Sequence, residues 1–431
     1  MKYLTIFCLF LFISAKGQDY EIVKEINQGN SKILEISFKN LKKDTVGYYY
    51  IKANSLIGFT SFGVGWTKPQ CVHSKKDFLI KYRTKKLQGR WSNIKETEAF
   101  VSPEETPTGL YWTDVLFGED LSVNDSIELY FYLPKDCDLS KIHLTFYNMS
   151  NEFENKDIDS RKTRTLKKKE YVEKNKECPP FPTYIPRSEW CGSYTSCHNP
   201  TYSVTVINPT HSVIHHGASP DTYTDGAAVV RSYWNYHVNT LGWADIGYNY
   251  LCDKYGNLYQ GRHNPYLNPT NYKDVKGAHA GYSNSYSIGF NFIGNADVTI
   301  PTDVQLDICM QFLAWWFDYY NFDPLSSAMI LLQSGDSYAN LPRICGHRDV
   351  NPGGTSCPGN TLYGMLPSIR TGTKEKIDAC NTPPDNVLPS TSISVQEEWI
   401  TTNFTTNFTD TDNVGIEKSF YQVLDFDGQY W

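Results

Sequence analysis

The 431-residue sequence contains few long apolar stretches and no excess of positive charge, and both absences narrow its function. Lysine and arginine together number 40, against 47 aspartate and glutamate residues, which gives a formal net charge of −7. A protein that holds nucleic acid on a basic surface is therefore not expected. Charged residues make up 20% of the chain and hydrophobic residues 40%, the composition of an ordinary folded protein. The length predicts two or three domains.

The apolar run near the N-terminus extends from Leu4 to Ala15, only 12 residues, and follows Lys2. A helix that spans a bilayer needs about 20 apolar residues. The small residues Ala15 and Gly17 are typical of a signal-peptidase site. We therefore expect residues 1–17 to be a signal peptide and the mature chain to have no integral membrane segment. Export would place the protein in the periplasm, at the cell surface or in the medium, where disulfides persist.

The sequence has 11 cysteines, and an even number remains once Cys8 of the signal peptide is excluded. An even number allows complete disulfide pairing, although spacing alone does not fix the connectivity. The preferred pairs are Cys71 with Cys137, Cys191 with Cys197, and Cys178 with Cys380. If one cysteine binds a metal, at least one other must stay a free thiol. The candidates for that thiol are Cys252, Cys309 and Cys345.

Composition divides the mature chain into several segments. Residues 19–150 contain short β-branched and aromatic stretches between polar turns, which predicts an all-β, sandwich-like domain. Residues 151–177 are charged and poor in apolar side chains, which indicates a linker. A domain is expected at residues 178–380, because it begins with a Pro-rich stretch and is followed by a Pro-rich linker at residues 381–391. Residues 392–431 are expected to be a partial β module or a tail.

No catalytic group is expected in the N-terminal domain. Its histidines are His73 and His143, and no acidic pair stands near either. Exposed Trp66, Trp91 and Trp112 would form a sugar-binding platform, but burial is the more common state of a tryptophan. The strands predicted in this domain cover residues 33–38, 47–51, 78–82, 127–133 and 142–147.

The chemistry is expected in the middle domain, which contains eight of the ten histidines. Residues 213–217 are predicted to be a short buried strand, on which His215 and His216 face opposite ways, so that only one enters a given site. His347 and Cys357 are joined by a Gly/Pro-rich loop that can bring them together. Two histidines and a cysteine leave a fourth position for water, as in catalytic zinc sites. The alternative is unrelated histidines and a disulfide-bonded Cys357.

Two helices are expected around this site. The first covers residues 225–239, and Asp221 and Asp225 before and at its start are interpreted as turn and capping residues. The second covers residues 302–320, and one apolar stripe along it is predicted to be core. The stripe consists of Val304, Ile308, Phe312, Trp315 and Tyr319.

Five motifs of this domain occur in a characteristic order. They are His-His at 215–216, Gly-Trp to Gly-Tyr-Asn-Tyr at 242–250, Gly-Arg at 261–262, Gly-Ala-His at 277–279, and Gly-His-Arg to Cys-Pro-Gly at 346–359. Because of these motifs, residues 184–370 resemble the zinc-dependent N-acetylmuramoyl-L-alanine amidases of type 2, whose fold is shared with peptidoglycan recognition proteins. The resemblance implies an α/β domain with a central mixed sheet flanked by helices. It also implies zinc as cofactor and peptidoglycan, with its glycan strand and stem peptide, as partner.

The resemblance further implies a role for each residue that matches the family pattern. The zinc ligands are His215, His347 and Cys357. The catalytic residues are Tyr248 and Thr355. The substrate-binding residues are His237, Trp243 and His279.

The residues support amide hydrolysis on chemical grounds as well. Zinc polarises an amide carbonyl, and the hydroxyls of Tyr248 and Thr355 can donate to the oxyanion that forms. The middle domain contains only Glu189 and Glu375 and no His-Glu-x-x-His, so a glutamate-based metalloprotease lacks its base. The paired carboxylates of a glycosidase are not visible either.

The expected function is hydrolysis of the amide between N-acetylmuramic acid and L-alanine in peptidoglycan. One alternative is a non-catalytic peptidoglycan-binding module. In relatives of that kind the zinc set is typically broken at the cysteine position, whereas Cys357 is present here. A zinc peptidase that acts on stem peptides is the other alternative.

Overall fold

The structure, a computed structural model, contains two compact units, Met1–Ile377 and Asp378–Trp431. It describes residues 19–28, 31–39, 49–66, 79–87, 89–97, 100–101, 110–118, 123–132, 139, 141–148, 179–192, 194–198, 200–381, 390–394 and 405–412. The predicted signal peptide and the charged segment 151–177 lie outside these residues. Among the residues described, no helix combines the length and the apolar character needed to cross a membrane.

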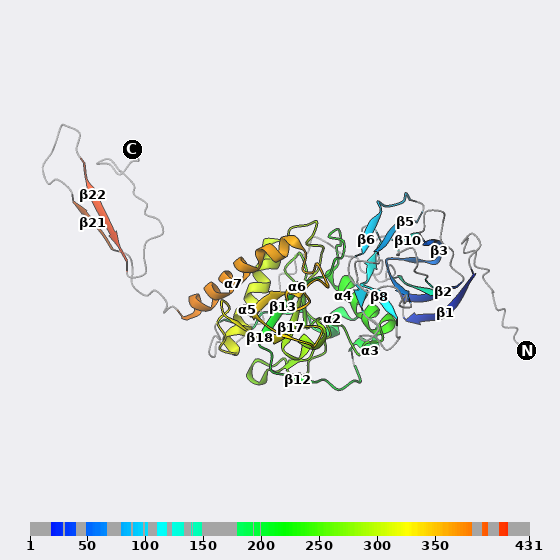
Figure 1. The fold of residues 1–431 in the computed structure, drawn as a ribbon. Helices are drawn as coiled ribbons and strands as arrows, with labels where there is room; N and C mark the ends of the chain where they lie inside the picture. Colours follow the sequence, from blue (N-terminus) through cyan, green and yellow to red (C-terminus); the bar gives the residue numbers. More distant parts are fainter. Residues whose placement is uncertain are drawn as a thin grey trace, which may run out of the picture. The chain divides into compact units, whose positions relative to one another are not determined.

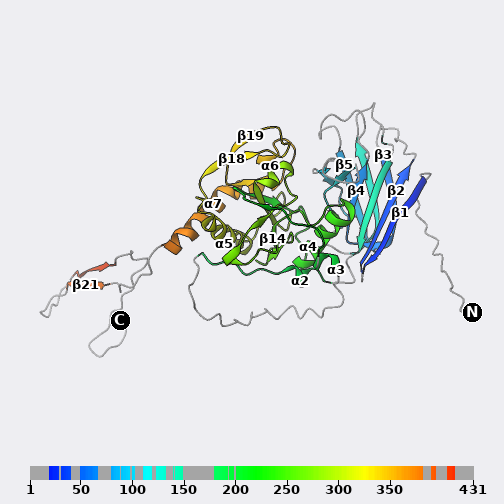
Figure 2. The same ribbon diagram turned by 90° about the horizontal axis from the view of Figure 1, so that it is seen from below.

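The N-terminal part is all-β within the residues described, and its strands form two antiparallel sheets. The larger sheet has the order β1-β2-β11-β4-β8-β7, with β9 beside β4, and Figure 2 shows β1 beside β2. Its strands are β1 (Asp19–Gln28), β2 (Ser31–Lys39), β4 (Ser61–Trp66), β7 (Phe100–Val101), β8 (Tyr111–Thr113), β9 (Leu116–Phe117) and β11 (Lys141–Asn148). The smaller sheet, in the order β3-β10-β5-β6, consists of β3 (Tyr49–Phe59), β10 (Asn124–Tyr132), β5 (Leu79–Lys86) and β6 (Lys95–Thr97). One core joins them, with Ile51 and Leu129 from the smaller sheet and Phe62 and Leu144 from the larger.

All five strands predicted here overlap observed ones, namely β2, β3, β5, β10 and β11. The prediction omitted β4, in which Phe62, Val64 and Trp66 alternate with small residues, because its two glycines, Gly63 and Gly65, are uncommon inside strands. Trp66 and Trp112 are buried, and the ring of Trp91 is covered by Lys52 and Arg83, 5.2 and 5.0 Å from its centroid. These three tryptophans therefore form no exposed platform.

The second part contains the predicted mixed sheet, in the order β15-β14-β17-β13-β20. Its strands are β13 (His211–His216), β14 (Tyr250–Cys252), β15 (Leu258–Gln260), β17 (Ser287–Phe292) and β20 (Ile344–Gly346). Strand β13 is parallel to both β17 and β20, and only β14 with β15 is antiparallel. All six residues of β13 are buried, as is typical of a parallel strand that is covered on both faces. Two-stranded pairs lie beside this sheet: β12 (Val206–Ile207) with β16 (Asp274–Val275), and β18 (Ser327–Leu331) with β19 (Tyr338–Pro342).

Helices cover this sheet. They are α2 (Arg187–Trp190), α3 (Thr195–His198), α4 (Gly226–Asn235), α5 (Asp303–Tyr319), α6 (His347–Val350) and α7 (Asn360–Asn381), with short 3-10 turns at Pro269–Asn271 and Gly281–Ser285. Asp225 caps α4 as predicted, since its side chain accepts hydrogen bonds from the backbone N–H groups of Ala227 and Ala228. The predicted helix 225–239 is α-helical only to Asn235, because residues Tyr236–Thr240 form a π-helix, η4.

The predicted core stripe of α5 is partly wrong. Phe312 and Trp315 are buried, but Val304 and Tyr319 at the ends are 54% and 43% exposed. The buried residues concentrate near the C-terminal half and include the consecutive run 312–317. Helices α5 and α7 lie side by side in Figures 1 and 2, and both contribute to one core cluster with β17. Because α5 packs against two neighbours, its buried face is wider than a single stripe.

The disulfide between Cys191 and Cys197 is present, with a Cα–Cα distance of 5.8 Å. Cys380 is also disulfide-bonded, whereas Cys71, Cys137 and Cys178 lie outside the residues described. Among the cysteines that the structure describes, Cys252, Cys309, Cys345 and Cys357 are free, which agrees with the prediction that Cys357 is not in a disulfide. The unit Asp378–Trp431 contains an antiparallel hairpin of β21 (Ser390–Ser394) and β22 (Asn407–Thr411).

Candidate metal centre

Three potential zinc ligands meet at the carboxyl ends of two neighbouring parallel strands. His215 lies near the end of β13, and His347 follows β20 directly as the first residue of α6. The loop after α6 returns Cys357 to the same place. The ligand atoms of His215, His347 and Cys357 all lie within 4.8 Å of one another, and His215 Nδ1 is 3.6 Å from Cys357 Sγ. Two imidazoles and a thiol at this spacing fit a zinc ion.

Each histidine of this triad has a second contact that orients its ring. His347 Nε2 lies 2.7 Å from Gln333 Oε1. An amide oxygen only accepts, so Nε2 of His347 carries the proton and the Nδ1 lone pair is available for a metal. His215 Nε2 is 3.0 Å from His279 Nδ1, which turns the other nitrogen of His215 toward Cys357. Sequence reasoning missed Gln333, because it lies in the turn between β18 and β19 and belongs to no motif.

Burial keeps His215 and His279 neutral at neutral pH. It is the main cause that lowers the pKa of His215 well below its usual value, and His347 nearby lowers it further. Burial, then His347, lowers the pKa of His279 to about 3. Neutral imidazole is the form that binds metals. Burial raises the pKa of the Cys357 thiol, and only a cation beside it would favour the thiolate.

The other histidine of the pair has a structural role. His216 points away from the triad, as the alternation of a strand requires, and its Nδ1 accepts a hydrogen bond from Ala296 N at 3.1 Å. On β17, Gly289 leaves room for the ring of His279. A Cβ atom at residue 289 would lie 2.5 Å from that ring, so a larger residue would displace the partner of His215.

All eight site residues predicted from the sequence line one cavity of about 1150 Å³. The ring centroid of Tyr248 is 5.3 Å from that of His215. Burial, then the charge of Asp114, raises the pKa of Tyr248, so its hydroxyl stays protonated and can donate. Thr355 Oγ1 accepts from Cys357 N at 3.1 Å, which leaves the hydroxyl hydrogen of Thr355 free to donate elsewhere.

The three predicted substrate-binding residues differ in their environments. His237 is only 6% exposed; its ring stacks on Trp243 at 4.7 Å, and its Nδ1 accepts from Gly247 N at 3.2 Å. His237 therefore fixes the segment that leads to Tyr248. Trp243 is half-buried at the cavity wall. His279 lies behind His215, so its contact in the structure is with a candidate ligand.

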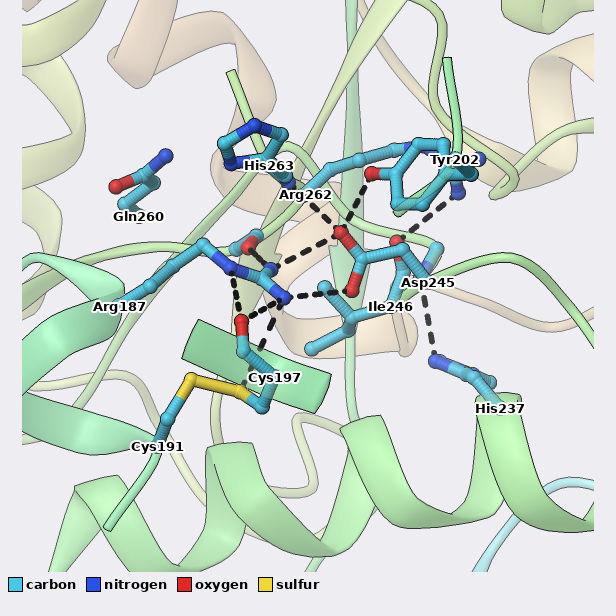
Figure 3. Close-up of polar contacts among 12 residues, drawn as sticks. Arg187, Cys191, Cys197, Tyr202, His237, Asp245, Ile246, Gln260, Arg262 and His263 are labelled. Atoms are coloured by element: carbon cyan, nitrogen blue, oxygen red, sulfur yellow. Dashed lines mark hydrogen bonds and ion pairs between the residues drawn. A yellow bond between two sulfur atoms is a disulfide. The ribbon is translucent and has the colours of Figure 1, made fainter. Parts of the chain in front are cut away.

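A buried ion pair of Arg187 with Asp245, neither of which lines the cavity, supports the segment 242–248. Figure 3 shows the guanidinium of Arg187 between the carboxylate of Asp245 and the backbone carbonyl of Cys197. Both N–O distances to Asp245 are 3.0 Å. Tyr202 Oη and the backbone N–H of His263 also donate to Asp245, at 2.7 and 2.8 Å. This buried carboxylate therefore accepts four hydrogen bonds, three at Oδ2 and one at Oδ1, which fix the loop between η4 and Tyr248.

Comparison with known proteins gives consistent matches to this part of the chain. Residues 206–360 match the family described as N-acetylmuramoyl-L-alanine amidase. Peptidoglycan-recognition protein SC2 of Drosophila melanogaster is 33% identical over 187 residues, which cover 43% of this chain and 84% of that protein. Peptidoglycan recognition protein 1 of Mus musculus is 30% identical over 189 residues, 43% of this chain and 86% of that protein. The solved structure of Drosophila PGRP-LB is 26% identical, covers 43% of this chain and 93% of that chain, and has a TM-score of 0.33.

Proposed function

Because the chain belongs to the family of peptidoglycan-recognition proteins and N-acetylmuramoyl-L-alanine amidases, we propose that it hydrolyses the amide between N-acetylmuramic acid and L-alanine in peptidoglycan. The proposed cofactor is zinc, held by His215, His347 and Cys357. The observation that carries the proposal is this triad, whose ligand atoms lie within 4.8 Å of one another in a cavity that Tyr248 also lines. A module that only binds peptidoglycan has no need of this chemistry.

Zinc bound by the triad would polarise the scissile carbonyl and lower the pKa of water at the site. The protein supplies the remaining groups. Gln333 and His279 hold the rings of His347 and His215 in place. The protonated hydroxyl of Tyr248 donates to the carbonyl oxygen as negative charge develops on it, and the hydroxyl of Thr355 is a second donor. Trp243 offers an aromatic face to the substrate at the cavity wall.

The test is digestion of purified peptidoglycan by the full chain, with zinc and with a chelator, followed by mass spectrometry. We expect zinc-dependent release of peptides that begin with L-alanine, together with intact glycan strands. Cleavage inside the stem peptide would favour a zinc peptidase instead. Retention of the protein on undigested wall material, with zinc present, would favour a recognition module.

Substitution Tyr248→Phe is expected to lower kcat about 10²-fold to 10³-fold, the usual effect of removing one oxyanion donor. The zinc content and the KM should stay close to those of the wild type, because the ring still fills its place beside His215. The matched control is Tyr250→Phe, two residues later, whose hydroxyl contacts Tyr272 in the core at 3.0 Å. Equal activity of Tyr248→Phe and Tyr250→Phe would remove Tyr248 from the mechanism.

A further inference from the structure

The cavity that contains the metal triad is walled partly by the N-terminal part, which the family match at residues 206–360 does not include. Strand β6 contributes Lys95–Thr97 to the lining, and the segment from β8 to β9 contributes residues 114–117. The loops after β13 and β17 line the same cavity with residues 218–222, 295 and 297–299. The N-terminal part therefore faces the space that a substrate would occupy.

Residues on both sides of Asp114 are anchored on the amidase-like part. The hydroxyl of Tyr236, in the π-helix η4, donates to the backbone carbonyl of Thr113. The edge of Phe117 packs on Tyr233 of α4, with centroids 5.8 Å apart. Val115 and Phe117 are buried in one core cluster with Tyr233 and Tyr236. Burial of large aromatic side chains makes this a stable contact.

The approach of the two parts is close enough to depend on a glycine. Gly63 of β4 lies against the ring of Tyr236, and a Cβ atom at residue 63 would come within 2.4 Å of that ring. Tyr147 of β11 also packs edge-on against Tyr236, at 6.2 Å. Tyr236 is thus enclosed by two strands of the larger sheet, and its hydrogen bond to Thr113 fixes the position of the next residue, Asp114.

Asp114 is half-buried, whereas its neighbours Thr113 and Val115 are buried. Asp114 lines the same cavity as Tyr248 and Cys357. The sequence predicted no catalytic group in the N-terminal part. It did not single out Asp114, because no motif surrounds this residue. Its position becomes evident only when the two parts are seen together.

We propose that Asp114 is a substrate-recognition residue, which accepts a hydrogen bond from a donor group of the peptidoglycan fragment bound at the triad. The inference rests on the proposed function, because it assigns a contact within the same site. Peptidoglycan fragments offer two donors of this chemistry: amide N–H groups near the scissile bond, and the ammonium group of a basic residue in the stem peptide. A carboxylate at the wall of the cavity makes a charge-assisted hydrogen bond to either donor.

The experiment uses the full, zinc-loaded chain with the substitutions Asp114→Asn and Asp114→Glu. The control is Asp125→Asn, which removes the same charge from the same part at a residue that does not line the cavity. The substrates are a muramoyl tripeptide with lysine at the third position and the same peptide acetylated on the lysine amine. Steady-state kinetics give kcat and KM, and calorimetry gives Kd. The zinc content and the thermal midpoint of each variant show whether it is folded.

We expect Asp114→Asn to lower kcat/KM at least about 10-fold, mainly through KM, the usual effect of losing a hydrogen bond to a charged group. Asp114→Glu should recover part of the loss, and Asp125→Asn should match the wild type. If the ammonium group is the donor, acetylation reduces the activity of the wild type but not that of Asp114→Asn. If an amide is the donor, Asp114→Asn lowers kcat/KM by the same factor on both peptides.

Values of kcat/KM and Kd for Asp114→Asn within twofold of the wild type, on both peptides, would overturn the inference. The two proposals fail separately in this design. If the wild type binds the peptides without cleaving them, the proposed hydrolysis fails. The dissociation constants of Asp114→Asn and Asp125→Asn then still decide whether Asp114 contacts the ligand. If Asp114→Asn does not fold, the comparison of Asp114→Glu with the wild type replaces it, since a longer carboxylate displaced at the wall should also raise KM.

Discussion

Substitution Cys357→Ala is expected to abolish amide hydrolysis, with a loss of about 10³-fold or greater in kcat/KM. The physical reason is that the metal supplies several kcal/mol of transition-state stabilisation, and about 4 kcal/mol corresponds to about 10³-fold. His347→Ala and treatment with a chelator should have the same effect, and zinc should restore only the chelated wild type. Zinc stoichiometry of the purified proteins and turnover of a soluble muramoyl peptide measure both parts of the prediction.

The matched control is Cys309→Ala, which removes another free, buried thiol of the same part of the chain. It lies on α5 in the core and should keep its zinc and its activity. Zinc should also raise the thermal midpoint of the wild type and of Cys309→Ala, but not that of Cys357→Ala, because only a protein that binds the ion is stabilised by it. Full activity of Cys357→Ala would refute the metal centre.

Substitution Asp245→Ala is expected to lower the free energy of unfolding by about 3–5 kcal/mol, because it leaves the guanidinium of Arg187 buried without its counter-charge. The side chains of Arg187 and Asp245 are only 4% and 1% exposed. Tyr202 and the backbone of His263 lose their acceptor in the same variant. Urea unfolding of the zinc-loaded protein measures the change.

The control for this prediction is Asp307→Ala. Asp307 pairs with Lys376 at 2.7 Å, but both side chains are partly exposed, at 48% and 31%. Exposed ion pairs contribute about 0–1 kcal/mol, so this loss should be small. The double substitution Arg187→Met with Asp245→Leu should be less destabilising than Asp245→Ala alone, since it leaves no unpaired charge. Equal losses for Asp245→Ala and Asp307→Ala would show that the buried pair does not hold the loop.

The triad was predictable because its motifs follow the order and spacing of the amidase family, and local rules are consistent with it. His215 and His216 alternate along one buried strand, and the Gly/Pro-rich loop after His347 returns the chain to Cys357. Strands β13 and β20 are parallel neighbours, so their carboxyl ends meet. The cap at Asp225 and the five N-terminal strands also follow from local propensity. The width of the buried face of α5 does not follow from local propensity, because it depends on how α7 and the sheet pack against this helix.

The sequence by itself determined the motifs that carry the resemblance to the amidase family, since motifs are local properties of the chain, and the mixed-sheet fold and the candidate site residues were predicted through that resemblance. Only the tertiary structure placed Gln333 beside His347, His279 behind His215, and Asp114 at the wall of the same cavity. These partners come from a turn, from another motif and from the N-terminal part. Contacts between residues far apart in sequence depend on how whole elements pack, and no short pattern encodes them.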